Sequence, residues 1–447
     1  MSLDSIVSVD ISISSASISK PGFGTTLILA SCPTAVDTAW GIERVRTYSS
    51  AAAMLAAGDG FTVNDQAYKI AVGIFSQNPK PQRIKVGRRT RKQTQTLKLT
   101  PTTTAVGHVY GSTVNGTTWT YTVLVADTTV AAVCAKLVTA ITAAAPVDVT
   151  AADHTSYITL TSGTAGKVHE HKNFSSGLTV EDTTVDPGIA TDFAEVAAVD
   201  KDFYTVKADT FGAAEIGALA TAIEATQYKY NAQTADSAAH EAGSADIGGV
   251  LHAASTFRTA IDWSPDYTWA FSAGKTGVES VSAPGTYTLF GKTVSGALPA
   301  DSLTETQTGN LDRKHYNYYQ SIGGVGRVIG GRVIGNEYED NVRGLDWLRA
   351  TMQVNIANAM FAASKIPNTA AGREVIKGQI AVSLEQAISK PAKPGLLAPD
   401  PAPVITMPPV SDASSFDSTT RTLSGVSWTA ALANAIHAVQ VTGTVTE

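Results

Sequence analysis

Cysteine is nearly absent from this chain, since its 447 residues include only Cys32 and Cys134, far apart in the sequence. This scarcity excludes a disulfide-rich scaffold and a zinc module built on cysteine pairs. Charge is scarce too: charged residues make up 16% of the chain, with 33 basic against 39 acidic side chains. A protein that coats nucleic acid needs a basic surplus, so the net charge of -6 argues against that class.

Long apolar runs are also missing, and none approaches the roughly 20 residues that a membrane-spanning helix needs. The first ten residues contain acids but no basic region typical of a signal peptide. Hydrophobic residues nevertheless make up 43% of the chain, and the mean hydropathy of +0.03 excludes wholesale disorder. We therefore expect a soluble protein of about three domains, with a weakly charged surface suited to being covered by neighbours.

Both ends of the chain have the two-residue periodicity of β-strands. The apolar members of these rows are Val7, Val9, Ile11 and Ile13 near the N-terminus and Val439, Val441 and Val445 near the C-terminus. Two interpretations are open: the strands pair within their own chain, or each arm completes a sheet in a neighbouring subunit. In the second case backbone hydrogen bonds, each contributing about 0.5–1.5 kcal/mol net, hold an assembly together.

Segments rich in proline and glycine adjoin these arms. Pro21 and Gly22 end the first strand, and the segment 391–409 contains seven prolines and is predicted to be an extended linker. We take Pro21, Gly22, Pro391 and Pro394 as candidate hinges. Apolar residues at helical spacing predict a final helix over about 428–439.

Between the arms, strand and helix patterns alternate, which is typical of an α/β sheet. Strands are predicted over residues 23–30, 83–86, 203–206 and 258–263. Helices are predicted over residues 48–57, 213–229, 345–360 and 375–388.

From residue 94 to about 186 the composition shifts to Thr, Val, Ala and Gly. The Asn115-Gly116 pair between β-forming residues predicts a hairpin over 110–125. A helix is predicted over 129–143, with Thr128 or Thr129 as its cap, and strands over 147–150 and 157–161 follow. We expect this compact module to be an insertion into the surrounding domain.

Several catalytic motifs nearly occur, but each fails on its spacing. Lys275 and Lys292 stand in Gly-Lys-Thr triplets, yet the earlier glycine of a phosphate-binding loop is missing. The glycines around Gly324 do not complete a dinucleotide fingerprint, which favours a Gly-rich strand–turn–strand. His169 and His171 lack an adjacent third metal ligand. We therefore expect no enzyme, no catalytic residue, no cofactor and no bound metal.

One basic cluster runs from Gly87 to Lys92. Its two interpretations are a site for an anionic partner and a solvated strand end leading into a linker. Because aromatic residues are not interleaved and the whole chain is acidic, the solvated strand end is favoured. The carboxylate pairs Asp200/Asp202 and Glu337/Glu339 are typical of surface strands.

The stretch from Arg421 to His437, which includes Ser424-Gly425-Val426-Ser427-Trp428, resembles the C-terminal signature of contractile-tail sheath proteins of long-tailed bacteriophages, specifically the DUF3383 group. Segments 6–11 and 22–25 look like the N-terminus of the same family, and Lys85-Val86-Gly87-Arg88-Arg89 is similar to a family motif before its inserted domain. Shorter matches follow in order at 202–204, 232–234 and 258–260. Together the motifs cover nearly the whole chain.

The resemblance implies a multidomain sheath subunit of mixed α/β class, with a small inserted α+β domain and terminal strand arms. Such subunits form stacked hexameric rings around a tail tube by exchanging strands, and the sheath contracts to drive the tube through the host envelope without hydrolysing nucleotide. The implied partners are neighbouring sheath subunits, the tail tube protein, and baseplate and tail terminator proteins, without direct nucleic-acid binding or membrane insertion. The implied location is the virion tail, after assembly in the host cytoplasm.

The corresponding domain assignment begins with a strand arm at 1–22. A discontinuous main α/β domain covers 23–93 and 189–390, an inserted outer domain covers 94–188, and a Pro-rich linker, helix and strand arm cover 391–447. The resemblance places the C-terminal domain on the inner side of the sheath, and Arg421 is our candidate for a tube-facing residue.

Two alternatives stay open. The first is another polymerising tail or tube protein, although a tube subunit is usually shorter and all-β. The second is an α/β enzyme with an unrecognised site. Particle shape distinguishes them, because a sheath forms rings or long tubes and an enzyme forms a small closed oligomer.

Overall fold

The computed structural model describes residues 22–56, 58–243 and 245–440. These residues form two compact units: a larger one of 22–345 together with 434–440, and a smaller one of 346–433. The division falls after Leu345, whereas the domain assignment from the sequence continued the main domain to residue 390.

The larger unit is built on a six-stranded mixed sheet with the strand order β13-β12-β11-β1-β3-β2. All neighbouring strands run parallel except β2, which pairs antiparallel with β3 at one edge. The strands are β1 (Thr26–Ser31), β2 (Val45–Tyr48), β3 (Ile84–Arg89), β11 (Thr205–Ala208), β12 (Lys229–Thr234) and β13 (Thr259–Trp263). The four strands predicted for this domain are confirmed.

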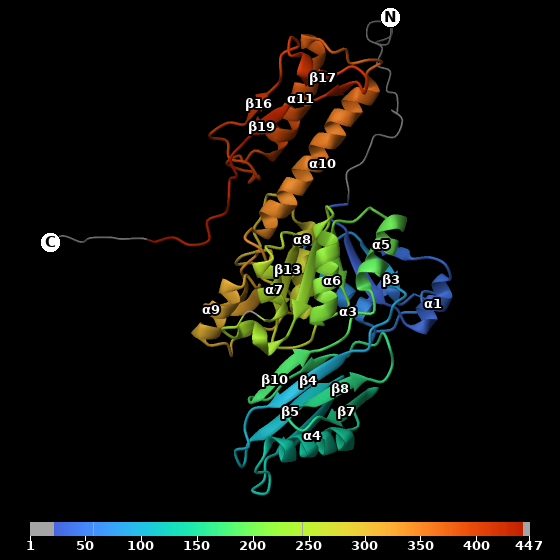
Figure 1. The fold of residues 1–447 in the computed structure, drawn as a ribbon, viewed down its shortest axis with the longest axis vertical. Coiled ribbons are helices and arrows are strands. Elements are labelled where there is room, and N and C mark those ends of the chain that lie inside the picture. The colour runs from blue at the N-terminus through green and yellow to red at the C-terminus, as the bar shows by residue number, and fades with distance from the viewer. Residues whose placement is uncertain (1–21, 57, 244, 441–447) are drawn as a thin grey trace, which may run out of the picture. The chain divides into compact units, whose positions relative to one another are not determined.

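Helices cover both faces of this sheet, because successive side chains of a buried strand point to opposite faces. Leu27 and Leu29 of β1 pack with α5 and α6, while Ile28 and Ala30 pack on the side of α3 and α8. The helices around this sheet that are labelled in Figure 1 are α1 (Thr34–Trp40), α3 (Gln66–Phe75), α5 (Ile189–Val199), α6 (Ala213–Glu224), α7 (Ile247–Ala253), α8 (Ala270–Val281) and α9 (Glu305–Arg313). The short helix α2 (Ala51–Met54) follows β2. A short 3-10 helix, η2 (Ser237–His240), precedes α7.

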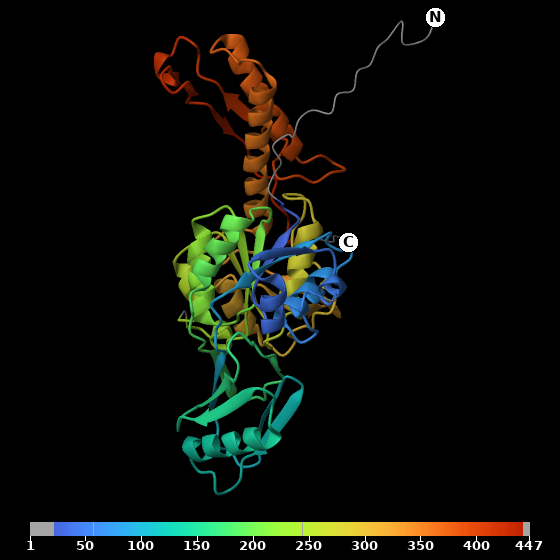
Figure 2. The ribbon, with the colours of Figure 1, turned by 90° about the vertical axis from the view of Figure 1, so that its right-hand side faces the viewer.

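The segment between β3 and α5 folds as a distinct module at one end of the larger unit (Figure 2). One of its sheets has the order β10-β4-β8-β7, the other β6-β5-β9. Its elements are β4 (Thr96–Pro101), β5 (Val109–Val114), β6 (Thr117–Thr122), α4 (Val130–Ala144), β7 (Val149–Asp153), β8 (Ile158–Ser162), β9 (His171–Lys172) and β10 (Leu178–Asp182).

Local signals predicted two details of this module correctly. Asn115 and Gly116 have φ angles of 47° and 82°, and such positive values at both central residues are those of the tight turn that joins twisted strands. The side chain of Thr129 accepts a hydrogen bond from the backbone N–H of Ala132, which caps α4.

The Gly-rich segment near Gly324 is the predicted strand–turn–strand, with β14 (Tyr318–Ile322) pairing antiparallel with β15 (Val325–Ile329). Helix α10 (Glu339–Ala362) then begins in the larger unit and ends in the smaller. Among the described helices, none combines the length and apolar character that crossing a membrane requires.

The smaller unit contains the rest of α10, helix α11 (Ala370–Ala387) and two short antiparallel ribbons. Both predicted helices of this region are confirmed. The ribbons pair β16 (Val404–Thr406) with β19 (Ser427–Thr429), and β17 (Phe416–Asp417) with β18 (Thr422–Leu423); the 3-10 helix η3 (Ala413–Ser415) lies between β16 and β17.

The helix predicted over 428–439 is wrong. Trp428 lies in β19 opposite Ile405, and Leu432 forms an antiparallel bridge with Leu397. Ile436, one of the apolar residues within the predicted span, is 84% exposed. Pairing with a distant segment satisfies the backbone groups that helical hydrogen bonds would otherwise satisfy.

The extended linker predicted over 391–409 is also wrong. Leu396 and Leu397 are buried, and the N–H of Leu397 donates to the carbonyl of Ala387 at 2.9 Å. Pro391 follows shortly after the end of α11, but the residues between the prolines of this segment are still packed and form backbone hydrogen bonds.

Candidate assembly surfaces

The smaller unit has a thin apolar core. Among its described residues, the buried apolar side chains are Leu348, Ala350, Ile380, Leu384, Ala387, Leu396 and Leu397. Large apolar side chains stay exposed near the end of α10, where Phe361 is 74% and Met360 is 53% exposed. A small unit that buries so little apolar surface gains little stability on its own. Its exposed apolar residues are therefore candidates for contacts with other chains.

The ribbon of β16 and β19 has two open edges, because each strand pairs only with the other among the described strands. Val404 of β16 is 58% exposed. A two-stranded ribbon is marginally stable in water by itself. Unpaired backbone groups along such an edge form a template for an added strand.

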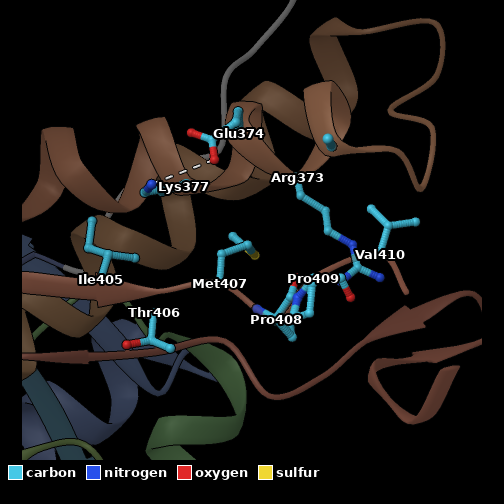
Figure 3. A pocket seen from close by; sticks show the side chains of 10 residues that line it. Arg373, Glu374, Lys377, Ile405, Thr406, Met407, Pro408, Pro409 and Val410 are labelled. Atoms are coloured by element: carbon cyan, nitrogen blue, oxygen red, sulfur yellow. Dashed lines mark hydrogen bonds and ion pairs between the residues drawn. The ribbon is translucent and has the colours of Figure 1, made fainter. Parts of the chain in front are cut away.

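A groove of about 420 Å³ lies between α11 and the segment that follows β16 (Figure 3). Arg373 extends from α11 across its floor toward Pro408 and Pro409, while Glu374 and Lys377 pair on its rim. The full lining is Ala370, Arg373, Glu374, Lys377, Ile405, Thr406, Met407, Pro408, Pro409 and Val410.

Arg373 is buried and explains why the Pro-rich segment is ordered. Its Nη1 donates to the carbonyls of Pro408 and Pro409 at 2.7 and 3.0 Å, and its Nη2 donates to Ser415 Oγ at 3.0 Å. Proline lacks a backbone N–H but keeps its carbonyl acceptor. One guanidinium therefore satisfies the carbonyl acceptors of both prolines, which lie outside any strand ladder.

Most residues predicted for the strand arms lie outside the described residues. These are Val7, Val9, Ile11, Ile13, Val441 and Val445, together with the hinge candidate Pro21. Val439 is described; it is 75% exposed and lies in no strand of the single chain. Its pairing with a neighbouring subunit stays a prediction.

The remaining candidates are scattered rather than gathered into one site. Gly22 starts a turn in which its carbonyl accepts from the N–H of Thr25 at 2.8 Å. Pro391 lies in a turn closed by mutual backbone hydrogen bonds of 2.9 Å between Lys390 and Lys393, just before Pro394. Arg421 is exposed in the turn between β17 and β18, with a φ of 53°. The hinge and tube-facing roles stay predictions.

The basic cluster 87–92 is not a solvated strand end, and that prediction is wrong. Arg89 is fully buried and pairs with Asp209 at 3.0 Å and with Glu215. Farther along, Arg91 and Lys92 pair with Asp192 and Asp37 at 2.9 and 2.6 Å. These internal partners neutralise the cluster, so it offers no basic patch to an anionic partner.

Glu339 is likewise buried, against the prediction of an exposed position. It accepts hydrogen bonds from Lys229 and Lys275, which also pair with Glu279 and Asp262, respectively, at 2.6 Å. None of these five side chains is exposed. Burial alone would lower the pKa of Lys275, but Asp262 and Glu339 outweigh it and raise that pKa. The sequence signal for this network is the charge of Lys229 and Asp262 within otherwise buried strands, whereas its other three members lie on α8 and α10.

The near-motifs for chemistry have structural roles. Lys275 lies on α8 inside this ion network and not in a phosphate-binding loop. His171 is fully buried, and burial lowers its pKa to about 3. His169 hydrogen-bonds Asn115 at 2.6 Å and the carbonyl of Asp148 at 3.1 Å. Within the described part of the chain, no group of three His, Cys, Asp or Glu residues is arranged to hold a metal ion.

Comparison with solved structures gives the fold. The helical sheath of the anti-feeding prophage in its contracted state aligns over 98% of this chain and 98% of its own, with a TM-score of 0.56 and 11% identity. The chain has the fold of a contractile sheath protein. The mixed α/β class and the sheath resemblance expected from the sequence are confirmed at the level of fold.

Two further solved structures are similar. The sheath tail protein of Desulfitobacterium hafniense aligns over 89% of this chain and 93% of its own, with a TM-score of 0.46 and 13% identity. The baseplate of the anti-feeding prophage aligns over 59% of this chain and 74% of its own, with a TM-score of 0.42 and 14% identity. No family model matches the chain, so the DUF3383 assignment stays a prediction. No curated protein matches it in sequence.

Proposed function

We propose that this protein is a structural subunit of a contractile phage tail sheath and not an enzyme. The observation that carries the proposal is the alignment of nearly the entire chain, through both compact units, with a contracted helical sheath. A likeness confined to the α/β sheet would also fit many enzymes, because one fold hosts many functions. The thin core and open ribbon of the smaller unit add independent support.

In this proposal, subunits join by exchanging terminal strands. The arm with Val7, Val9, Ile11 and Ile13 and the arm with Val439, Val441 and Val445 add to the open edges of a neighbour's ribbon of β16 and β19. Each added backbone hydrogen bond contributes about 0.5–1.5 kcal/mol net. When this strand exchange is repeated around stacked hexameric rings, it joins the subunits into a continuous mesh.

Contraction requires the subunits to move while this mesh holds. The larger unit suits a rigid-body movement because a doubly covered sheet and buried ion pairs resist deformation. Gly22, Pro391 and Pro394, with Pro21, are the hinge candidates. The work comes from the free-energy difference between two packings of the same subunits, which drives the tube through the host envelope.

The proposed partners are other sheath subunits, the tail tube protein, and the baseplate and tail terminator proteins. We assign Arg421 to the surface that faces the tube and the inserted module, 94–188, to the outer surface. The proposed location is the phage tail, after assembly in the host cytoplasm.

Gel filtration combined with negative-stain electron microscopy of the purified chain tests the proposal. We expect rings or long tubes with a central channel wide enough for an inner tube. A small closed oligomer at every concentration examined would contradict it.

A further inference from the structure

The last described residues, 434–440, return to the larger unit. Within this segment, every residue is exposed except His437, whose side chain is half-buried. The segment is therefore attached mainly through one ring. Its neighbours Ile436 and Val439 are 84% and 75% exposed.

His437 fits a slot made by two aromatic side chains and a hydroxyl. Its ring stacks on Phe290 with centroids 4.5 Å apart and planes inclined by 17°. Tyr338 meets the ring edge-on at 4.9 Å and 87°. Nε2 of His437 lies 3.0 Å from Oγ1 of Thr288, within hydrogen-bond distance.

The slot is itself held by a second set of contacts. Arg332 lies 4.6 Å over the ring of Tyr338 and also donates from Nη2 to its hydroxyl at 2.7 Å. In the first turn of α10, Asn341 donates to Oδ1 of Asn434 at 3.2 Å. Asn434 has a φ of 43°, so the backbone turns at the point where the segment meets the unit.

We propose that this slot anchors the base of the C-terminal arm, with His437 as the positioning residue and residues 438–447 as the part passed to a neighbouring subunit. The inference rests on the proposed strand exchange, because it assigns that arm a fixed starting point. A donated strand with a fixed base reaches its acceptor at a higher effective concentration than a strand on a long free tether.

The surroundings of the slot favour a neutral ring. Burial and the nearby Arg332 lower the pKa of His437. The undocked ring has the ordinary value of 6.5, so the docked ring binds a proton less readily. Docking is therefore tightest above pH 6.5 and weakens as the pH falls below it.

The mobility of a nitroxide label at Val439→Cys tests the anchor, because both native cysteines are buried and Val439 is exposed two residues after His437. Electron paramagnetic resonance of the full-length chain is measured at pH 7.5, at a concentration too low for polymerisation. We expect His437→Ala to shorten the rotational correlation time of the label by about twofold or more, since the segment then lacks its main restraint. Thr288→Val, which removes the hydroxyl but keeps the aromatic slot, should give a smaller change.

His154→Ala is the matched control, because His154 also stacks on a tyrosine, Tyr157, at 4.7 Å but lies in the inserted module. It should leave the mobility of the label unchanged. Equal mobility of the label with and without His437→Ala would overturn the anchor, even if tubes form. A chain that forms no tubes, but in which His437→Ala mobilises the label, would instead contradict the proposed function and leave the anchor standing.

Discussion

Lys275 Nζ lies 2.6 Å from Glu339 Oε1 inside the larger unit, although 64 positions separate the residues and neither side chain is exposed. The pair fastens the first turn of α10 to α8. Lys229 holds the other carboxylate oxygen of Glu339, so one buried carboxylate bridges two buried ammonium groups, each of which has a further carboxylate partner.

Replacing this carboxylate should destabilise the larger unit. Glu339→Gln leaves Lys229 and Lys275 with one carboxylate partner each, Glu279 and Asp262, but removes two charge-assisted hydrogen bonds from a buried site. We therefore expect a loss of about 3–5 kcal/mol in unfolding free energy. Urea unfolding followed by tryptophan fluorescence measures it. The control is Glu181→Gln, whose partner Lys98 is on the surface, with an expected change within about 0.5 kcal/mol. Equal free energies of unfolding for the two variants would contradict a stabilising role of the buried ion network.

Lys207 should make the free energy of unfolding depend on pH in the alkaline range. Burial lowers its pKa from 10.5 to about 7, and its Nζ donates to the carbonyl of Asn231 at 3.1 Å. Above pH 7 the unfolded chain binds the proton that the folded chain has lost, so stability rises with pH. The contribution is at most about 1.4 kcal/mol per pH unit.

Comparison with Lys207→Met between pH 7 and 9 isolates this effect. Cysteines and tyrosines also titrate as the pH rises, but their contributions cancel in the difference between the two proteins. We expect the wild type to gain stability relative to Lys207→Met across this range. A constant difference would show that Lys207 stays charged in the folded chain.

Two glycines should respond oppositely to the same substitution. Gly116 has a φ of 82° in the hairpin turn, so Gly116→Ala should cost about 1–2 kcal/mol. Gly309 lies within α9, and an added Cβ would meet no atom within 4 Å. Gly309→Ala should therefore stabilise the chain by about 0.5–1 kcal/mol. Thermal unfolding measures both, and a shared sign would contradict the described backbone.

Deleting residues 1–18 should separate folding from assembly. The deletion leaves every element of the two described units in place, so we expect an unchanged unfolding transition but no tubes in electron micrographs. A finer version changes Val7, Val9, Ile11 and Ile13 to Ser, with Ser8→Ala and Ser12→Ala as the control that spares the apolar row. Long tubes from the deleted chain would refute the role of this arm.

Local patterns predicted much of the fold, as three elements illustrate. The Asn115-Gly116 turn, the Thr129 cap and the helix α11 depend on residues a few positions apart. Such local interactions can be predicted directly from the order of the residues in the sequence. The candidate assembly surfaces were harder to predict from the sequence. The ribbon of β16 and β19 pairs a proline-rich segment with a segment whose apolar spacing resembles that of a helix.

The sequence by itself determined the alternation of strands and helices, the inserted module and the periodicity of the two ends, because each follows from spacing along the chain. Only the tertiary structure decided the burial of Arg89 and Glu339, the pairing of Trp428 with Ile405 and the seating of His437 beside Phe290. The physical reason is that a charge, a strand edge or an aromatic ring is stabilised by a partner in space, and these partners lie far away in the chain.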